Sequence, residues 1–246
     1  MKKNMSKLLL FDCDGTLASP GEKIDDTTLD LLLKLKKKYQ LGIISGSPKE
    51  KIESQTRYLP FHHLFPECGS IYYQLNNNNN YKEIYRKNIR NHPIFPQLNI
   101  FIKISLHFLS QVNYPISGHI IDIRNSLIYI SLIGQQASKE ERNEFIKNHS
   151  SLRTNLLELL NKKVKELELE EKISIKEGGA VGIAIYPTEW DKIQVLDVLE
   201  KQNFEKIYYF GDKYLENGND FKIINDPRVI GIKVDNNISN HLLKLE

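Results

Sequence analysis

An apolar run that ends directly at a pair of aspartates is the feature that most limits how this chain can fold. Residues 7–11 (Lys-Leu-Leu-Leu-Phe) are apolar after the first, which is typical of a strand buried on both faces of a parallel sheet. Asp12, Asp14, Gly15 and Thr16 follow at once. Because ligands of doubly wound α/β sheets bind at the carboxyl ends of the strands, the sequence predicts a polar site where this strand ends.

Strand and helix patterns alternate at both ends of the chain, as in an α/β protein. Asp25 or Asp26 can cap a helix that runs to about Tyr39, and Pro48 lies near the start of a second helix. The alternation returns after Trp190. The remaining predicted elements of this part are strands over residues 41–45, 206–210 and 229–234, and helices over 189–201, near 220 and up to 245.

The middle of the chain has an α+β pattern instead. The β-rich runs 117–124 and 127–133 predict a hairpin, and the strands 172–176 and 181–186 add to an antiparallel sheet. Between them, Ser138 and Glu141 match a capping box, with helix expected to about residue 167. The asparagine run 76–80 is expected to be an exposed hinge or loop. We therefore expect a doubly wound core with a parallel sheet, residues 1–82 and 187–246, and an inserted α+β domain, residues 83–186.

Composition excludes several functional classes. The 34 Lys and Arg against 31 Asp and Glu give a net charge of +3, which is too small to indicate a nucleic-acid partner. Cys13 and Cys68 cannot form a disulfide framework and lack zinc-site spacing. No stretch approaches the roughly 18 apolar residues of a membrane span, and Asp12 interrupts the only apolar run near the start. We expect a cytoplasmic protein with neither a membrane nor a nucleic-acid partner.

The paired aspartates indicate a cation. Two carboxylates two residues apart repel each other unless a cation or a proton lies between them. Mg²⁺ takes hard oxygen ligands and keeps open positions for phosphate oxygens. Gly15 and Thr16 add small residues with backbone N–H donors, which suit a phosphate group. The alternative, two solvated loop aspartates, does not account for this neighbourhood.

Four motifs at strand ends resemble the haloacid dehalogenase superfamily of phosphotransferases. They are the Asp-x-Asp-Gly-Thr-Leu segment 12–17, Gly46-Ser47, Lys192 at a helix start, and Gly211-Asp212 with Asn219-Asp220. The resemblance implies that Asp12 is the nucleophile that becomes an aspartyl-phosphate and that Asp14 is the general acid and base. Ser47 would bind phosphoryl oxygens and Lys192 would neutralise developing charge. The resemblance implies Mg²⁺ on Asp12, Asp212 and the backbone carbonyl of Asp14, with weaker candidates for a second cation at Ile224, Asp226 and Val229.

A narrower resemblance, to the eukaryotic-type phosphomannomutases, covers nearly the whole chain. Its segments are Ile123-Arg124-Asn125, Ile133-Gly134, Glu140-Glu141-Arg142, Gly178-Gly179, Tyr186-Pro187, Trp190-Asp191-Lys192, Gly218-Asn219-Asp220 and Asp226-Pro227-Arg228. The resemblance implies interconversion of mannose 6-phosphate and mannose 1-phosphate for GDP-mannose biosynthesis, with a hexose 1,6-bisphosphate as activator. It also implies that the inserted domain is a cap with a four-stranded antiparallel sheet, through which two copies form a homodimer. The substrate-binding candidates are Arg124, Arg142 and Gln135.

This chain departs from the family pattern at four phosphosugar contacts. Gly21 and Gln135 stand where the family has arginines, and Gly182 and Ala184 stand where it has a serine and an aspartate. Losing cations there weakens the hold on a phosphate that must not escape during turnover. The first alternative is therefore a Mg²⁺-dependent phosphatase acting on a different phosphorylated substrate. The second alternative is an inactive homologue that serves as a binding module.

Overall fold

The computed structural model describes residues 6–216, 218–235 and 238–246 and divides the chain into two compact units. One unit comprises Met1–Arg86 and Trp190–Glu246, and the other comprises Lys87–Glu189. Both chain ends thus belong to the same unit. Each unit has its own sheet, and each is described separately below.

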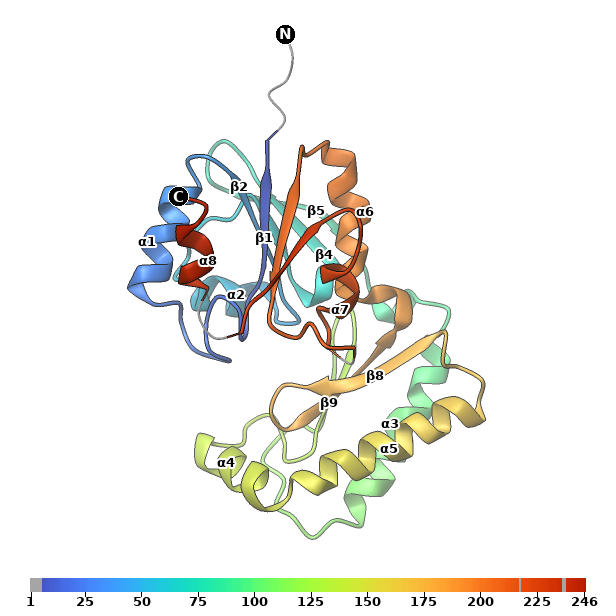
Figure 1. Cartoon of the computed structure of the whole chain (residues 1–246). Helices are drawn as coiled ribbons and strands as arrows, with labels where there is room; N and C mark the ends of the chain where they lie inside the picture. The colour runs from blue at the N-terminus through green and yellow to red at the C-terminus, as the bar shows by residue number, and fades with distance from the viewer. Residues whose placement is uncertain (1–5, 217, 236–237) are drawn as a thin grey trace. The chain divides into compact units, whose positions relative to one another are not determined.

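The first unit is built on a seven-stranded sheet whose strands β11, β10, β1, β2 and β3 are parallel. Strands β4 and β5 extend one edge in antiparallel fashion. Figure 1 shows β1 beside β10, so the first strand of the chain pairs with a late one. In sheet order the bounds are β11 (Ile230–Lys233), β10 (Ile207–Gly211), β1 (Leu8–Asp12), β2 (Gln40–Ile44), β3 (His63–Phe65), β4 (Ile71–Leu75) and β5 (Tyr81–Arg86).

Helices cover both faces of this sheet, which confirms the doubly wound α/β prediction. Helices α1 (Asp26–Leu35), α2 (Lys49–Gln55) and α8 (Ser239–Leu243) contribute to one apolar cluster. Helices α6 (Val195–Leu199) and α7 (Phe221–Ile224) contribute to the other, and Figure 1 shows α1 and α6 on opposite sides of β1. Strand β1 is buried along its whole length because it lies between these two clusters.

Helix α1 begins where the sequence predicts and ends earlier. The Asp25 side chain accepts a hydrogen bond of 2.6 Å from the Thr28 backbone N–H, which caps the helix. The prediction that the helix reaches Tyr39 is wrong. After Leu35 the N–H groups of Lys37 and Lys38 bond to carbonyls three residues back, so the chain tightens into turns before β2.

The predicted continuous helix over 189–201 is also wrong, and the break has a local cause. The Asp191 backbone is extended, and its side chain accepts a 2.7 Å hydrogen bond from the Lys192 N–H. This cap begins a new helical segment at Lys192, first as a 3₁₀ turn over Lys192–Gln194 and then as α6. The interruption directs the Lys192 side chain into the interior, where it is buried.

The asparagine run 76–80 is a hairpin turn between β4 and β5 rather than a hinge between units. The Asn76 side-chain oxygen accepts hydrogen bonds from the N–H groups of Asn78 and Asn80. Such asparagine turns close a hairpin through their own side chains. The chain passes into the second unit only after Arg86.

The second unit has the predicted α+β architecture with a four-stranded antiparallel sheet. In sheet order its strands are β6 (Ile121–Ile123), β7 (Ile128–Ser131), β9 (Gly182–Pro187) and β8 (Ile173–Gly178). Its helices are α3 (Phe95–Ser110), α4 (Lys139–Asn148) and α5 (Ser150–Glu166), with α3 and α5 side by side along the sheet in Figure 1. No helix in the described part of the chain is long and apolar enough to cross a membrane.

Two helices of this unit differ in how well the sequence predicts them. The capping box of α4 is present: the N–H of Glu141 donates to Ser138 Oγ, and the N–H of Ser138 donates to a Glu141 carboxylate oxygen. Helix α3 was not predicted. Its core contacts use Leu98, Phe101 and Leu109, but apolar and β-branched residues also occupy its other faces, so the helical period is weak in the sequence.

His63 is a buried histidine on β3 whose two ring nitrogens both have hydrogen-bond partners. Its Nδ1 lies 2.8 Å from the Tyr72 hydroxyl, and its Nε2 lies 2.7 Å from the Gln40 side-chain oxygen. Gln40 Oε1 can only accept, so the neutral ring carries its proton on Nε2. Burial lowers the pKa of His63 to about 3.

We therefore expect His63 to make folding acid-sensitive. In the unfolded chain the pKa is near 6.5, so below that pH the unfolded state binds a proton that the folded state excludes until about pH 3. Stability is complete above pH 6.5 and falls by about 1.4 kcal/mol per pH unit within that window. Urea unfolding at pH 7, 6 and 5 measures this loss, and it should be smaller in His63→Gln. Replacing the exposed His107 by glutamine is the control. If the free energy of unfolding falls equally with pH in all three proteins, the prediction is contradicted.

Candidate active site

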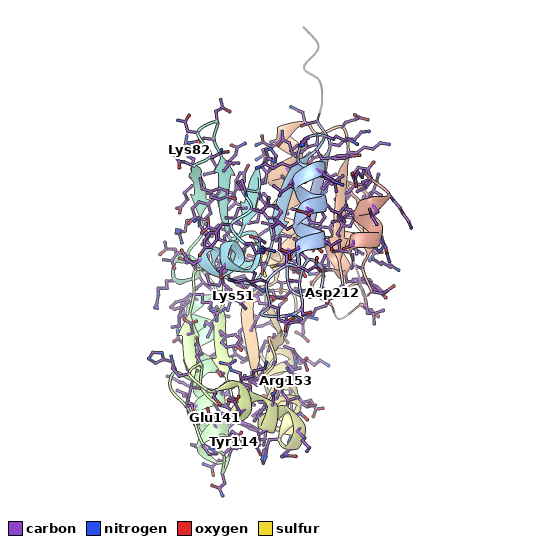
Figure 2. All side chains as sticks on the ribbon, turned by 90° about the vertical axis from the view of Figure 1, so that its left-hand side faces the viewer. Lys51, Lys82, Tyr114, Glu141, Arg153 and Asp212 are labelled. Atoms are coloured by element: carbon purple, nitrogen blue, oxygen red, sulfur yellow. The ribbon has the colours of Figure 1, made fainter. Side chains whose placement is uncertain are left out.

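The predicted site residues of the first unit gather where the parallel strands end. Asp12 is the last residue of β1, and Asp212 directly follows β10, the neighbouring strand. Ser47 lies just beyond β2, on the other side of β1. Figure 2 labels Asp212 at this edge of the sheet. Parallel neighbours end on the same side, so segments far apart in the sequence supply one cluster.

A buried lysine joins two carboxylates at the centre of the cluster. Lys192 Nζ lies 2.6 Å from Asp12 Oδ1 and 2.7 Å from Asp220 Oδ1. The side chain of Lys192 is 1% exposed, and those of Asp12 and Asp220 are 7% and 0% exposed. A buried charge is tolerated only when it is paired and hydrogen-bonded, and here each partner meets that requirement through the others.

The pKa shifts follow from this arrangement. Burial alone lowers the pKa of Lys192, but the carboxylates of Asp12 and Asp220 outweigh burial, so its pKa lies well above the usual value. Burial raises the pKa of Asp12 to about 7, although Lys192 acts in the opposite direction. For Asp220 the charge and hydrogen bond of Lys192 outweigh burial, and its pKa is lowered. A cation beside Asp12 would favour its ionised form further.

Asp220 is the site residue that sequence reasoning did not assign. Its Oδ1 also accepts a hydrogen bond from the buried Tyr209 hydroxyl, and its Oδ2 accepts one of 3.1 Å from the Lys213 N–H. Both oxygens are thus engaged in holding the ion pair with Lys192. The signal was present in the Asn219-Asp220 motif, but only the structure gives this carboxylate a partner.

Asp12, Asp212 and Asp220 form an acidic group that can hold a metal ion. One carboxylate oxygen from each lies within 4.8 Å of the others. Because both oxygens of Asp220 already accept hydrogen bonds, Asp12 and Asp212 are the better candidate metal ligands. Close by in sequence, Asn219 Oδ1 is buried without a hydrogen-bond partner among the described residues. These hard oxygen donors fit Mg²⁺.

Gly15 brings the loop after β1 against Asp212. Its φ is +93°, and an added Cβ would lie only 2.3 Å from Asp212 Oδ2. The neighbouring Thr16 hydroxyl donates a 3.3 Å hydrogen bond to Asp212 Oδ1. The Asp-Gly-Thr sequence therefore positions the second carboxylate of the acidic group as well as the first.

Asp14 is placed apart from the acidic group. Its Oδ1 accepts hydrogen bonds of 2.9 Å from the Gly21 N–H and 2.8 Å from the Gln55 side-chain amide. Gly21 has a φ of +79°, and its backbone thereby holds Asp14 in place. Asp14 is partly exposed.

The remaining core candidates are less closely connected. Ser47 is buried at the strand ends, and its N–H donates to Ser45 Oγ at 3.1 Å. The second-cation candidates Ile224, Asp226 and Val229 lie in and after α7. The carboxylate of Asp226 accepts hydrogen bonds from the Arg228 guanidinium, and it is not part of the acidic group.

The second unit holds the three substrate-binding candidates. Arg124 Nε donates to Asp122 Oδ2 at 2.7 Å, and the guanidinium lies 4.7 Å from the centre of the Tyr129 ring. Arg142 donates to the carbonyls of Ala137 and Gln135 at 3.0 and 2.8 Å. Gln135 thus contacts Arg142 through its backbone carbonyl, whereas Arg124 lies just after β6 with its guanidinium against the Tyr129 ring.

Comparison of the sequence with known proteins gives a consistent family. The model of the family described as eukaryotic phosphomannomutase matches residues 28–242. Phosphomannomutase 1 of Dictyostelium discoideum is 34% identical over 232 residues, which cover 90% of this chain and 88% of that protein. The phosphomannomutase of Arabidopsis thaliana is 31% identical over 233 residues, covering 92% of this chain and 90% of that protein.

Solved structures with a similar fold are more distant in sequence. IMP-nucleotidase of Plasmodium falciparum, in a truncated form bound to IMP, has a TM-score of 0.64 at 15% identity and covers 99% of this chain and 68% of its own. The C-terminal domain of trehalose-6-phosphate phosphatase from C. albicans has a TM-score of 0.57 at 18% identity, covering 90% and 74%. At these identities the likeness shows the fold alone.

The buried ion cluster leads to a stability prediction. Lys192→Met should lower the free energy of unfolding by about 3–5 kcal/mol, because two buried carboxylates lose their counter-charge. Lys222→Met is the matched control: Lys222 pairs with Asp191 at 3.4 Å but is 48% exposed, so its loss should change stability by about 1 kcal/mol or less. Chemical denaturation of both variants measures the difference, and equal losses would contradict the role given to Lys192.

Proposed function

Because the chain belongs to the eukaryotic phosphomannomutase family, we propose that it interconverts mannose 6-phosphate and mannose 1-phosphate through an aspartyl-phosphate and a hexose bisphosphate. The observation that carries this proposal is the buried cluster in which Lys192 joins Asp12 to Asp220 at the ends of β1 and β10. A carboxylate held beside a fixed cation is suited to accept a phosphoryl group. The family match over both units supports the choice of substrate.

The proposed cycle starts with a phosphoryl group on Asp12, taken from a hexose 1,6-bisphosphate. The free hydroxyl of a bound hexose monophosphate gives its proton to Asp14, and its oxygen attacks the phosphorus while the bond to Asp12 breaks. The resulting bisphosphate turns over, and Asp12 attacks the other phosphorus. The sugar oxygen then leaves with the proton from Asp14, so atoms and charge balance at the end of each cycle.

Lys192 and Asp220 have different roles in this scheme. Lys192 would neutralise the charge that develops on the transferring phosphoryl oxygens, because its ammonium group already contacts Asp12. Asp220 would keep Lys192 charged and oriented without touching the substrate. The hydroxyl of Ser47, just beyond β2, would donate a hydrogen bond to a phosphoryl oxygen.

Mg²⁺ is the cofactor that we propose for the acidic group. Asp12, Asp212 and the backbone carbonyl of Asp14 would hold it, and the unpartnered oxygen of Asn219 provides a further polar contact nearby. The ion would supply positive charge to the phosphoryl oxygens during transfer. Ile224, Asp226 and Val229 stay the weaker proposal for a second cation.

The second unit is proposed to be the cap that binds the phosphate not undergoing transfer. Arg124 and Arg142 would supply guanidinium contacts, and Gln135 would be a neutral neighbour. The proposal includes a homodimer formed through this unit, as the resemblance to the family implies. The proposal includes a place in GDP-mannose biosynthesis in the cytoplasm, where Cys13 and Cys68 would stay reduced as the free thiols seen here.

A phosphatase is the second candidate, and a specific observation favours it. The positions Gly21, Gln135, Gly182 and Ala184 lack the charged or polar side chains of the family pattern. A weaker hold on the hexose phosphate that should receive the phosphoryl group would let water reach the aspartyl-phosphate on Asp12 first, and water would then attack the phosphorus and release inorganic phosphate while the bond to Asp12 breaks. The third candidate is an inactive homologue that serves as a binding module. It does not explain why the chain keeps the buried cluster of Lys192, Asp12 and Asp220.

A ³¹P NMR time course with mannose 6-phosphate, Mg²⁺ and catalytic glucose 1,6-bisphosphate distinguishes these functions. We expect a growing mannose 1-phosphate signal that is absent in Asp12→Asn, because the amide is a poor nucleophile. Growth of inorganic phosphate alone would replace the mutase proposal by a phosphatase. No Asp12-dependent change, even with other hexose phosphates, would support the inactive homologue.

Metal dependence is a separate prediction. Chelation with EDTA should abolish turnover, and added Mg²⁺ should restore it. Asp212→Asn should need more Mg²⁺ for half-maximal activity and lose at least about 100-fold in kcat, since a charge in the acidic group is lost. Asp235→Asn, an exposed carboxylate after β11, is the control. Activity that survives both chelation and Asp212→Asn would refute the metal site.

A further inference from the structure

One face of the four-stranded sheet in the second unit is free of helices. On β7 and β9 the buried residues Ile128, Ile130, Ile183 and Ile185 alternate with residues of the opposite face. Helices α3 and α5 contact these two strands, so the isoleucines lie on the helix side. Tyr129 and its cross-strand neighbour Ala184 therefore lie on the open face.

Tyr129 occupies the space above Gly182. An added Cβ at Gly182 would lie 2.3 Å from the Tyr129 hydroxyl oxygen and 2.4 Å from the ring carbon that carries it. The same hydroxyl donates a 3.0 Å hydrogen bond to the Gly178 carbonyl, which fixes the ring in this position. A side chain at position 182 and this position of the ring exclude each other, so the two residues form a matched pair.

The ring of Tyr129 lies next to an arginine side chain. The Arg124 guanidinium lies 4.7 Å from the ring centre, within the range of a cation–π interaction. Burial raises the pKa of Tyr129, and the charges of Arg124, Arg142 and Arg153 oppose that rise. Figure 2 labels Arg153, which is engaged with the carbonyls of Gly179 and Ala180. The ring thus contacts Arg124, one of the two arginines proposed to bind phosphate.

A buried hydroxyl lies next to this pair. Ser131 follows Tyr129 by two residues on β7, so it shares its face, and it pairs across the sheet with Gly182. It is 1% exposed, and its Oγ has no hydrogen-bond partner within the described ranges. A buried polar atom without a hydrogen-bond partner, next to the Tyr129–Gly182 pair, is typical of a place that a polar ligand completes.

We propose that Tyr129 is a specificity-determining residue that contacts the sugar with its ring, in place of polar side chains from positions 182 and 184. This inference rests on the proposed function, because it assumes that the open face meets the sugar of a hexose phosphate. The ring offers apolar area to the C–H groups of the sugar, while Arg124 beside it offers charge to the phosphate. Recognition of the sugar here then depends on contact with the ring rather than on hydrogen bonds from β9.

The test compares a sugar phosphate with a phosphate that lacks the ring. Dissociation constants of mannose 6-phosphate and glycerol 3-phosphate are measured by titration calorimetry with the wild-type protein and with Tyr129→Ala. We expect mannose 6-phosphate to bind about tenfold more weakly to the variant and glycerol 3-phosphate to change little. Equal weakening of both would overturn the proposal, because Tyr129 would then only position Arg124. Tyr114→Ala, a tyrosine on a loop of the same unit, is the control and should leave the ratio unchanged.

A second set of variants tests the matched pair. Gly182→Ala should weaken the binding of mannose 6-phosphate selectively, because its methyl group displaces the ring. Most of this effect should disappear when it is combined with Tyr129→Ala, which leaves only the 2.7 Å approach of the new Cβ to the Ile130 carbonyl oxygen. Additive effects would contradict the pairing. Tyr129→Phe keeps the ring and should keep the selectivity, which also covers the case in which Tyr129→Ala fails to fold. If the wild-type protein binds no hexose phosphate, the proposed function fails together with this inference; if it binds one and the ratio stays constant, only this inference fails.

Discussion

The contact between the Lys192 ammonium and the carboxylates of Asp12 and Asp220 is the interaction on which the rest of the first unit depends. A lysine this deeply buried stays charged only because both carboxylates lie within hydrogen-bond distance. The partners come from the start and the end of the chain. Strand β1 must therefore lie beside β10, and the segment that carries Lys192 must return to the same sheet, before the charges are satisfied. The whole insertion between residues 87 and 189 has to leave and rejoin the sheet without disturbing this cluster.

The three aspartates near Lys192 differ in the contacts that their carboxylates make. Both carboxylate oxygens of Asp220 accept hydrogen bonds, Oδ1 from Lys192 and Tyr209 and Oδ2 from the Lys213 N–H. Asp220 therefore holds the ion pair in place and is a less suitable cation ligand than Asp12 or Asp212. Asp12 accepts the Lys192 hydrogen bond through its Oδ1, and Asp212 lies against the loop after β1 because Gly15 has no side chain. The result is the proposed nucleophile, Asp12, next to an acidic group that can hold a metal ion, both at the ends of two neighbouring strands. This is the half of the molecule that follows the family pattern closely.

The second unit follows the family pattern less closely, and the changes there are connected to one another. The Tyr129 ring occupies the space that a side chain at position 182 would need, so this position of the ring requires glycine there. Arg124 rests against that ring, and Arg142 is held by backbone carbonyls near Gln135. The loss of a polar residue on β9 is thus accompanied by a large aromatic residue on β7. Three of the four departures from the family pattern, at Gln135, Gly182 and Ala184, thus lie in a different unit from the ion cluster.

The sequence by itself determined the features that depend on local chemistry. Strand β1, the Asp25 cap of α1, the Ser138–Glu141 capping box and the motifs at the strand ends are set by residues close together in the chain. The tertiary structure decided what depends on neighbours far away: helix α3, the role of Asp220 and the pairing of Tyr129 with Gly182. Each of these follows from strand register and packing between distant segments. Periodicity and spacing report which face a residue occupies, but only the folded sheet determines which side chain it meets there.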